Sequence, residues 1–231
     1  MRIFETDPDA KPRKREATTV GRFRSGRQVN GQAVALPTFR ITTDSTEVIG
    51  KLAELFGGTP SEWETAGEDF NEIITDVDKV LVVIDGPDSL RFDMRLYSRT
   101  NQLIHHCDGV ESLMDEDRGK PCGCPALMED RKAYAKSGRG PQPYTMLNFR
   151  LADDYGLGVF RFQSNSWTVL PFLDEYWTAL KGVGGESLAE FELELVEYTT
   201  KKGREVSYRR PAIKVLKPWA EAITDDADTD Y

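Results

Sequence analysis

Both histidines and all three cysteines of this 231-residue chain lie within residues 105–124. Thiolate sulfur and imidazole nitrogen are donors that zinc prefers, and four of them in a tetrahedron form a closed structural site with no position for water. Four residues of the segment meet that count: His106, Cys107, Cys122 and Cys124. The sequence therefore predicts a structural zinc site that clasps the polar loop between the first and last thiols.

Two other interpretations of the same segment remain open. The thiols can be reduced and the histidines solvated, because a Cys-x-Cys pair is less diagnostic than paired Cys-x-x-Cys motifs. A catalytic zinc would need an open position and a general base, for which Asp108 or Asp115 could serve. Carboxylates are abundant throughout this acidic chain, so their proximity in sequence is weak evidence for catalysis.

Charge is unevenly distributed along the chain, whose formal net charge is −9. Residues 1–27 carry eight basic and four acidic side chains, whereas residues 221–231 carry five acids and no base. An acidic body repels phosphate, so we expect any action on nucleic acid to run mainly through another protein. Direct contact with DNA would fall to the basic residues near the N-terminus, which are Lys11, Arg13, Lys14, Arg15, Arg22, Arg24 and Arg27.

The composition of the chain and its cysteines also indicate the cellular compartment in which the protein is expected. The longest apolar run, residues 80–84, is too short to cross a bilayer, and the first twenty residues lack the apolar region of a signal peptide. Three cysteines, an odd number, fit a reducing cytoplasm better than a secreted disulfide scaffold. These features predict a soluble, non-secreted protein without a membrane segment.

Hydrophobic periodicity predicts the helices and strands along the chain. Residues 38–42 alternate like a half-buried strand, and residues 46–56 have helical spacing between a Ser45 cap and the Gly57-Gly58 stop. Further strands are expected near residues 80–84, 92–96, 147–151, 159–162, 191–195 and 206–215, with a second helix over residues 170–180. A shift in apolar parity across residues 209–211 suggests a bulge in the last of these strands.

The pattern is typical of an α+β fold: antiparallel sheets with two main helices and a zinc-clasped loop. It is compatible with a duplicated strand-helix-strand-strand plan. We expect a disordered basic arm over residues 1–20, a composite domain over 21–219 and a disordered acidic tail over 220–231. Within the composite domain, the cysteine segment 101–144 would join subdomains of about 21–100 and 145–219.

A series of short motifs, in this order, resembles the recombination directionality factor family of actinobacterial phages. The resemblance covers roughly residues 21–216, and its most specific element is Phe56-Gly57-Gly58-Thr59-Pro60 with Trp63 downstream. The other matching segments are residues 21–24, 37–42, 52–55, 107–109, 122–125, 156–162 and 211–216.

The resemblance implies a non-enzymatic partner of a large serine integrase in the cytoplasm of the bacterial host. Such a factor binds the integrase, near its coiled-coil region, and switches it from integration to excision between the hybrid sites attL and attR. The family pattern often has cysteines where this chain has Leu103 and about Pro141. That difference makes His105 or His106 the natural replacement ligand, with His106 preferred.

Two other functional classes remain as alternatives. A nucleic-acid-binding or processing protein with a structural zinc is the first, because α+β sandwiches also occur in RNA-binding enzymes and the basic arm could guide a strand. A zinc hydrolase is the second. The resemblance itself implies little or no direct sequence-specific DNA binding.

Overall fold

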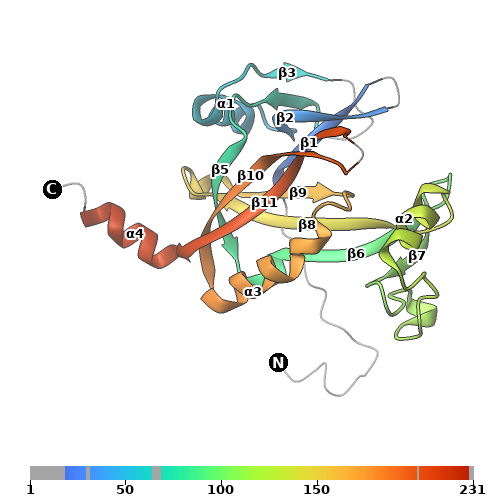
Figure 1. Cartoon of the computed structure of the whole chain (residues 1–231). Coiled ribbons are helices and arrows are strands. Elements are labelled where there is room, and N and C mark those ends of the chain that lie inside the picture. Colours follow the sequence, from blue (N-terminus) through green and yellow to red (C-terminus); the bar gives the residue numbers. More distant parts are fainter. Residues whose placement is uncertain (1–18, 30–31, 64–68, 202, 229–231) are drawn as a thin grey trace.

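The computed structural model describes residues 19–29, 32–63, 69–201 and 203–228 (Figure 1). In this part of the chain eleven strands form one mixed sheet, accompanied by four α-helices. The expected α+β class is therefore confirmed. The helices are α1 (Thr46–Phe56), α2 (Met128–Lys136), α3 (Leu173–Val183) and α4 (Trp219–Asp228).

Strand pairing runs in the order β11-β10-β5-β8-β9-β1-β2-β4-β3, while β6 pairs with β8 and β7 pairs with β6. The strands are β1 (Thr19–Val29), β2 (Gln32–Thr43), β3 (Ser61–Glu62), β4 (Asn71–Ile74), β5 (Lys79–Asp85), β6 (Leu90–Tyr97), β7 (Leu103–Cys107), β8 (Gln142–Leu151), β9 (Val159–Ser164), β10 (Glu186–Thr199) and β11 (Glu205–Pro218). All pairs are antiparallel except β1 with β9, a parallel contact between the two halves of the chain that periodicity did not predict.

One hydrophobic core joins both halves. Its centre is a set of mutually packed phenylalanine rings whose centroids lie 5.0–6.3 Å apart, contributed by Phe23, Phe39, Phe149, Phe160, Phe162 and Phe191. Because β5 and β10 bring their apolar side chains to the same core as β1, β2, β8 and β9, the sheet folds over this cluster. The opposite face of β1, β8 and β9 is left outside the core, since side chains alternate along a strand.

Helix α1 covers one end of the core. The Ser45 side chain accepts a hydrogen bond from the backbone N–H of Val48 at 3.2 Å, which satisfies a free donor of the first turn. The helix ends before Gly57, and its apolar stripe is buried: Val48, Ile49, Leu52 and Phe56.

Helix α3 begins one turn later than the periodicity indicated. Leu170–Phe172 form a 3-10 turn that holds Pro171, and the α-helix follows from Leu173. Tyr176 and Leu180 are buried against the core, whereas the Trp177 side chain is 41% exposed.

The C-terminal segment differs from the expected disordered tail, because α4 extends to Asp228. The Trp219 ring stacks on Tyr155 with centroids 5.9 Å apart, and Ala222 is buried. These two contacts tie the acidic helix to the sheet. Of the expected basic arm, residues 1–18 lie outside the described residues.

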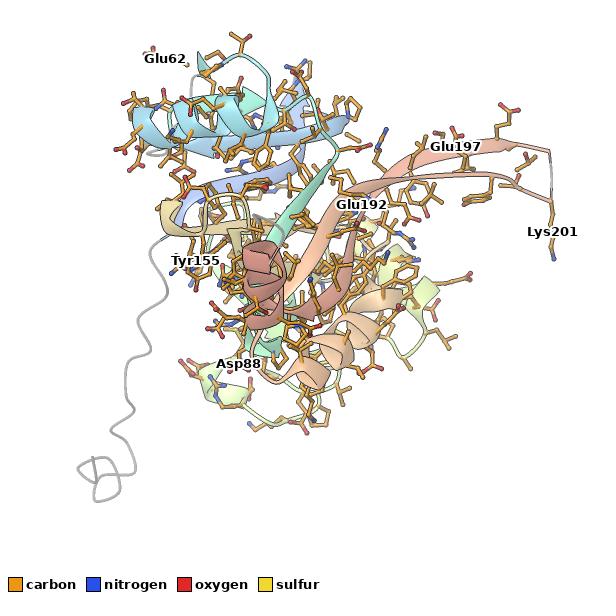
Figure 2. All side chains as sticks on the ribbon, turned by 90° about the vertical axis from the view of Figure 1, so that its left-hand side faces the viewer. Glu62, Asp88, Tyr155, Glu192, Glu197 and Lys201 are labelled. Carbon is orange, nitrogen blue, oxygen red and sulfur yellow. The ribbon has the colours of Figure 1, made fainter. Side chains whose placement is uncertain are left out.

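Strands β10 and β11 form a long hairpin that projects from the body of the molecule (Figure 2). Pairing continues without a break from Leu193↔Pro211 to Thr199↔Glu205, so the bulge expected at residues 209–211 is absent. The register shifts instead beside Leu188. Arg209 anchors the hairpin through Asp78 Oδ2 at 2.6 Å and the Leu193 carbonyl oxygen at 2.7 Å.

Among the described residues, no helix is long and apolar enough to span a membrane.

Candidate metal centre

Strand β7 sets the directions of three consecutive side chains, those of His105, His106 and Cys107. Its antiparallel pairing with β6 sets Cys107 opposite Met94 and His105 opposite Leu96. Successive side chains of a strand point to opposite faces. His105 and Cys107 therefore share one face of β7, and His106 lies on the other.

Cys124 completes a group that could hold a metal ion with His105 and Cys107, since one ligand atom from each lies within 4.8 Å of the others. Cys107 Sγ is 3.8 Å from Cys124 Sγ, and Cys124 Sγ is 3.5 Å from His105 Nε2. A disulfide would require about 2.05 Å between sulfurs, so the two thiols are separate.

Burial controls the protonation of this group. It raises the pKa of the Cys107 thiol to about 12, and the neighbouring thiols of Cys124 and Cys122 add to the effect. Burial also raises the pKa of Cys124, and it lowers the pKa of His105 together with the charge of His106. Without a cation both thiols stay protonated near pH 7, which makes them poor nucleophiles. A bound cation would favour the thiolates.

A polar loop brings the chain back to β7. The Asp108 carboxylate accepts hydrogen bonds from the backbone N–H groups of Val110 and Glu111 at 2.8 and 2.7 Å, which closes a tight turn. The Cys122 backbone N–H then donates to the Val110 carbonyl oxygen at 2.9 Å. Gly123 has a φ of 72°, a conformation that favours glycine, and the chain turns there before Cys124.

Two predicted ligands lie outside the three-residue group. His106 points to the other face of β7, where its Nε2 is 3.1 Å from Asp93 Oδ2, an ion-pair distance without the alignment of a hydrogen bond. Asp93 is also held by Arg95, whose Nε and Nη2 lie 2.6 and 2.7 Å from its carboxylate oxygens. Cys122 is half-buried and close enough for its thiol to raise the pKa of both other cysteines.

A comparison with known protein families shows the family to which the chain is related. The profile of the Gp3-like family, described as recombination directionality factor-like, matches residues 20–217. The chain belongs to this family. It is a family of recombination accessory factors rather than of catalysts. No solved structure matches this directionality factor-like chain.

Arg131 belongs to the candidate metal site, although no motif of the sequence marks it. It lies on α2, and its Nε donates to the Pro125 carbonyl oxygen at 2.5 Å while Nη2 donates to the Gly109 carbonyl oxygen at 2.7 Å. One guanidinium thus bridges the loop that follows Cys107 and the loop that carries Cys124. Its charge also lowers the pKa of Cys124 against the effect of burial. No local pattern marks Arg131, because both partners are backbone carbonyls, which carry no sequence signal, and Gly109 is 22 residues away.

The residues proposed for nucleic acid contact in this directionality factor-like chain divide into two groups. Lys11, Arg13, Lys14 and Arg15 lie outside the described residues. Arg22, Arg24 and Arg27 belong to strand β1 rather than to an arm. Arg22 forms an ion pair with Asp69 at 3.1 Å, and Arg24 Nε lies 3.4 Å from Thr42 Oγ1.

Proposed function

We propose that this protein binds a large serine integrase and switches it from integration to excision of phage DNA between the hybrid sites attL and attR. The match of residues 20–217 to the recombination directionality factor-like family carries this proposal. The contact with the integrase would involve its coiled-coil region. The reaction would take place in the cytoplasm of the bacterial host, where integrase and prophage DNA meet.

Such a switch requires no chemistry by the factor itself. The factor only has to bind the excision-competent arrangement of the integrase more tightly than the integrative one. Moving an equilibrium from 1:99 to 99:1 needs about 10⁴-fold tighter binding, or ~5.5 kcal/mol. A protein interface of ordinary size can supply that difference. The net charge of −9 favours docking on a basic, DNA-bound partner.

We also propose that the metal is zinc and that its role is structural. Zinc bonds of about 2.3 Å to sulfur and 2.0–2.1 Å to nitrogen, arranged tetrahedrally, require about 3.8 Å between sulfurs and about 3.5 Å between sulfur and nitrogen. Cys107 and Cys124 are 3.8 Å apart at Sγ, and Cys124 Sγ is 3.5 Å from His105 Nε2. These three donors therefore fit zinc. Cys122, whose nearby thiol raises the pKa of both other cysteines, is our proposed fourth ligand.

Zinc would hold the loop of residues 108–123 against β7. Three thiolates and one imidazole leave no open position for water, so the bound ion contributes folding energy rather than Lewis-acid chemistry. Arg131 supports the same clasp from outside through the Gly109 and Pro125 carbonyl oxygens.

The deciding experiment is an in vitro recombination assay with purified integrase on attL and attR substrates, with and without the full-length protein. We expect excision only when the protein is present, together with inhibition of the integrative reaction. A catalytically inactive integrase gives the matched control for contaminating recombinase. Failure to bind or redirect the integrase encoded beside it would contradict the proposal.

A further inference from the structure

The outer face of the sheet gathers arginines that the metal centre does not use. Four of them lie within a run of four paired strands, β6-β8-β9-β1, although they come from distant parts of the chain. We call this surface the arginine face: Arg22 and Arg24 on β1, Arg161 on β9 and Arg91 on β6.

Strand register aligns these side chains. Arg22 is paired with Arg161 across the parallel β1–β9 contact, and Arg161 is paired with Asn148 across β8–β9. Arg91 is paired with Met146 on the other edge of β8. Strands are about 4.8 Å apart, so the three spacings from β6 to β1 make the face about 14 Å wide.

The face is hollowed along its length. A hollow of about 630 Å³ contains Arg91 and Arg161, and a second of about 310 Å³ lies between Arg161, Arg22 and Arg24. A third, of about 830 Å³, continues from Arg24 past Arg27. The three hollows follow one another on this face, since Arg161 lines the first and second and Arg24 lines the second and third. We call this row of hollows the groove.

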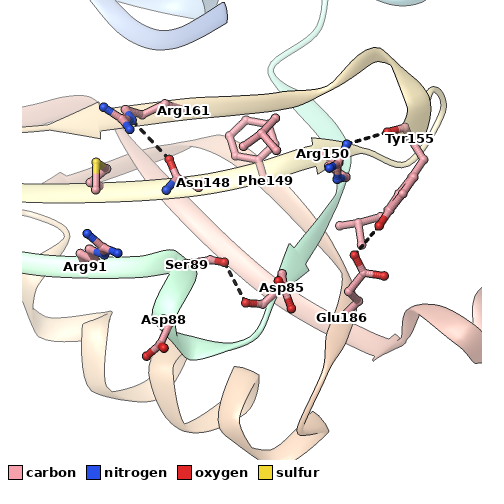
Figure 3. A pocket seen from close by; sticks show the side chains of 13 residues that line it. Asp85, Asp88, Ser89, Arg91, Asn148, Phe149, Arg150, Tyr155, Arg161 and Glu186 are labelled. Atoms are coloured by element: carbon pink, nitrogen blue, oxygen red, sulfur yellow. Dashed lines mark hydrogen bonds between the residues drawn. The ribbon is translucent and has the colours of Figure 1, made fainter. Parts of the chain in front are cut away.

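Figure 3 shows the first hollow, where Arg91 on β6 and Arg161 on β9 flank Asn148 on β8, the strand between them. Arg161 Nε is 3.3 Å from Asn148 Oδ1. Away from Arg161 the same hollow is lined by Asp85, Asp88 and Glu186 and by Arg150, so acidic groups outnumber basic ones at that end. An anionic ligand would therefore follow the groove away from this acidic end, toward Arg24 and Arg27.

Positive charges crowd one another on β1. Burial lowers the pKa of Arg24, and the nearby charges of Arg40 and Arg22 lower it further. Arg40 is neutralised by Glu72 at 2.5 Å and lies under the Trp63 ring, with 4.3 Å from Cζ to the ring centroid. Arg24 Nε lies 3.4 Å from the Thr42 hydroxyl, and the carboxylate of Asp69, which pairs with Arg22, offsets part of the repulsion. An anion in the groove would relieve this repulsion.

We propose that the arginine face binds the phosphate backbone of duplex DNA without reading its sequence. Guanidinium groups on successive strands suit a row of phosphates, which recur about every 3.4 Å of helix axis on each DNA strand, and the side-chain amides of Asn148 and Gln163 add neutral donors. The choice of DNA over an acidic protein rests on the proposed role in recombination. The contact would position the factor beside an integrase that is already bound to its site.

The test is the salt dependence of binding between the full-length protein and a labelled duplex of arbitrary sequence, measured by fluorescence anisotropy without integrase. The test variant Arg91→Gln/Arg161→Gln is compared with Lys51→Gln/Lys181→Gln, which removes the same charge from exposed positions on α1 and α3. Thermal melting checks that both variants fold, and Arg91→Gln alone serves if the double variant does not.

We expect the wild-type association constant to fall steeply with salt, by a slope of about −0.9 for each phosphate contacted. The arginine variant should bind at least about tenfold more weakly, with a slope smaller by about two, while the lysine variant stays within about twofold of wild type. Absence of DNA binding, equal weakening in both variants, or equally strong competition by poly-glutamate would overturn the inference. Since no integrase is present, this result is independent of the excision assay.

Discussion

His105 and His106 are adjacent in the chain and lie on opposite faces of strand β7. His105 Nε2 is 3.5 Å from Cys124 Sγ, whereas His106 Nε2 is 3.1 Å from Asp93 Oδ2. The alternation of a strand therefore decides which imidazole can share a metal with the buried thiol of Cys107. Replacing each histidine in turn should therefore affect metal binding differently.

Replacing His105 should remove zinc, and replacing His106 should not. We expect His105→Ala to lower the zinc content well below one equivalent after dialysis, because one of the proposed ligands is lost. His106→Ala is the matched control and should retain zinc near the wild-type level. Zinc per chain is measured by atomic emission on the purified proteins. Equal retention, or a larger loss in His106→Ala, would refute the assignment of His105.

Removing the metal should loosen the clasp and leave the core folded. The phenylalanine cluster does not depend on the cysteine loop, whereas residues 108–123 are held by turns and by the proposed ion. After treatment with a strong chelator we expect faster amide exchange in residues 104–125 and unchanged exchange in β8 and β10. Re-addition of zinc should restore protection. Global unfolding on chelation would show that the site supports the whole domain.

Loss of the Arg131 bridge should weaken zinc binding without removing a ligand. Arg131→Met deletes the hydrogen bonds to the Gly109 and Pro125 carbonyl oxygens and retains much of the side-chain volume. Supporting contacts of this kind are worth about 10- to 100-fold in metal affinity. Competition with a chromogenic chelator measures the change. Lys132→Met, at the exposed neighbouring position on α2, should leave the affinity unchanged.

The turn after α1 depends on glycine. Gly58 has a φ of 87°, and a Cβ added there would collide with the Ile74 carbonyl oxygen. Gly58→Ala should therefore lower the free energy of unfolding by about 1–3 kcal/mol, as measured by urea denaturation. Gly50→Ala supplies the contrast, because Gly50 lies inside α1 with open space around its Cα. That substitution should raise stability by up to ~1 kcal/mol.

The projecting hairpin is expected to contribute to the integrase contact. Its outer half pairs Val196 with Tyr208 and Tyr198 with Val206, and the Tyr198 side chain is 51% exposed. Exposed tyrosines are frequent at the centres of protein interfaces. Tyr198→Ser should weaken integrase binding at least about tenfold, a loss of ~1.4 kcal/mol, and reduce excision at limiting protein.

Val110→Ser is the control for that variant, because Val110 is an exposed apolar residue of the cysteine loop, away from the hairpin. It should bind integrase like the wild type in the same pull-down titration. If Tyr198→Ser binds as tightly as the wild type while Val110→Ser is impaired, the cysteine loop rather than the hairpin makes the contact.

Local patterns were sufficient for the elements whose apolar residues have a clear period. The Ser45 cap, the apolar stripe and the Gly57-Gly58 stop predicted α1 to within a residue, because a helix start, face and end are encoded by residues close in sequence. The apolar run of residues 80–84 predicted β5, and the patterns of apolar residues near 147–151, 159–162 and 191–195 predicted β8, β9 and β10, for the same reason. Helix α4 was missed because its acidic sequence offers few apolar positions, and it is held by contacts such as Trp219 on Tyr155.

By itself the sequence determined that the zinc-type donors gather in residues 105–124, and its motifs indicated the family. Only the tertiary structure decided the rest. The register of β7 against β6 decides that the His105 side chain, and not that of His106, faces the thiols. Arg131 reaches the site from helix α2. The arginine face arises from the parallel contact of β1 with β9, which joins residues more than a hundred positions apart. The spacing of residues along the chain does not reveal such contacts, because the register between distant strands is fixed by the hydrophobic core that they share.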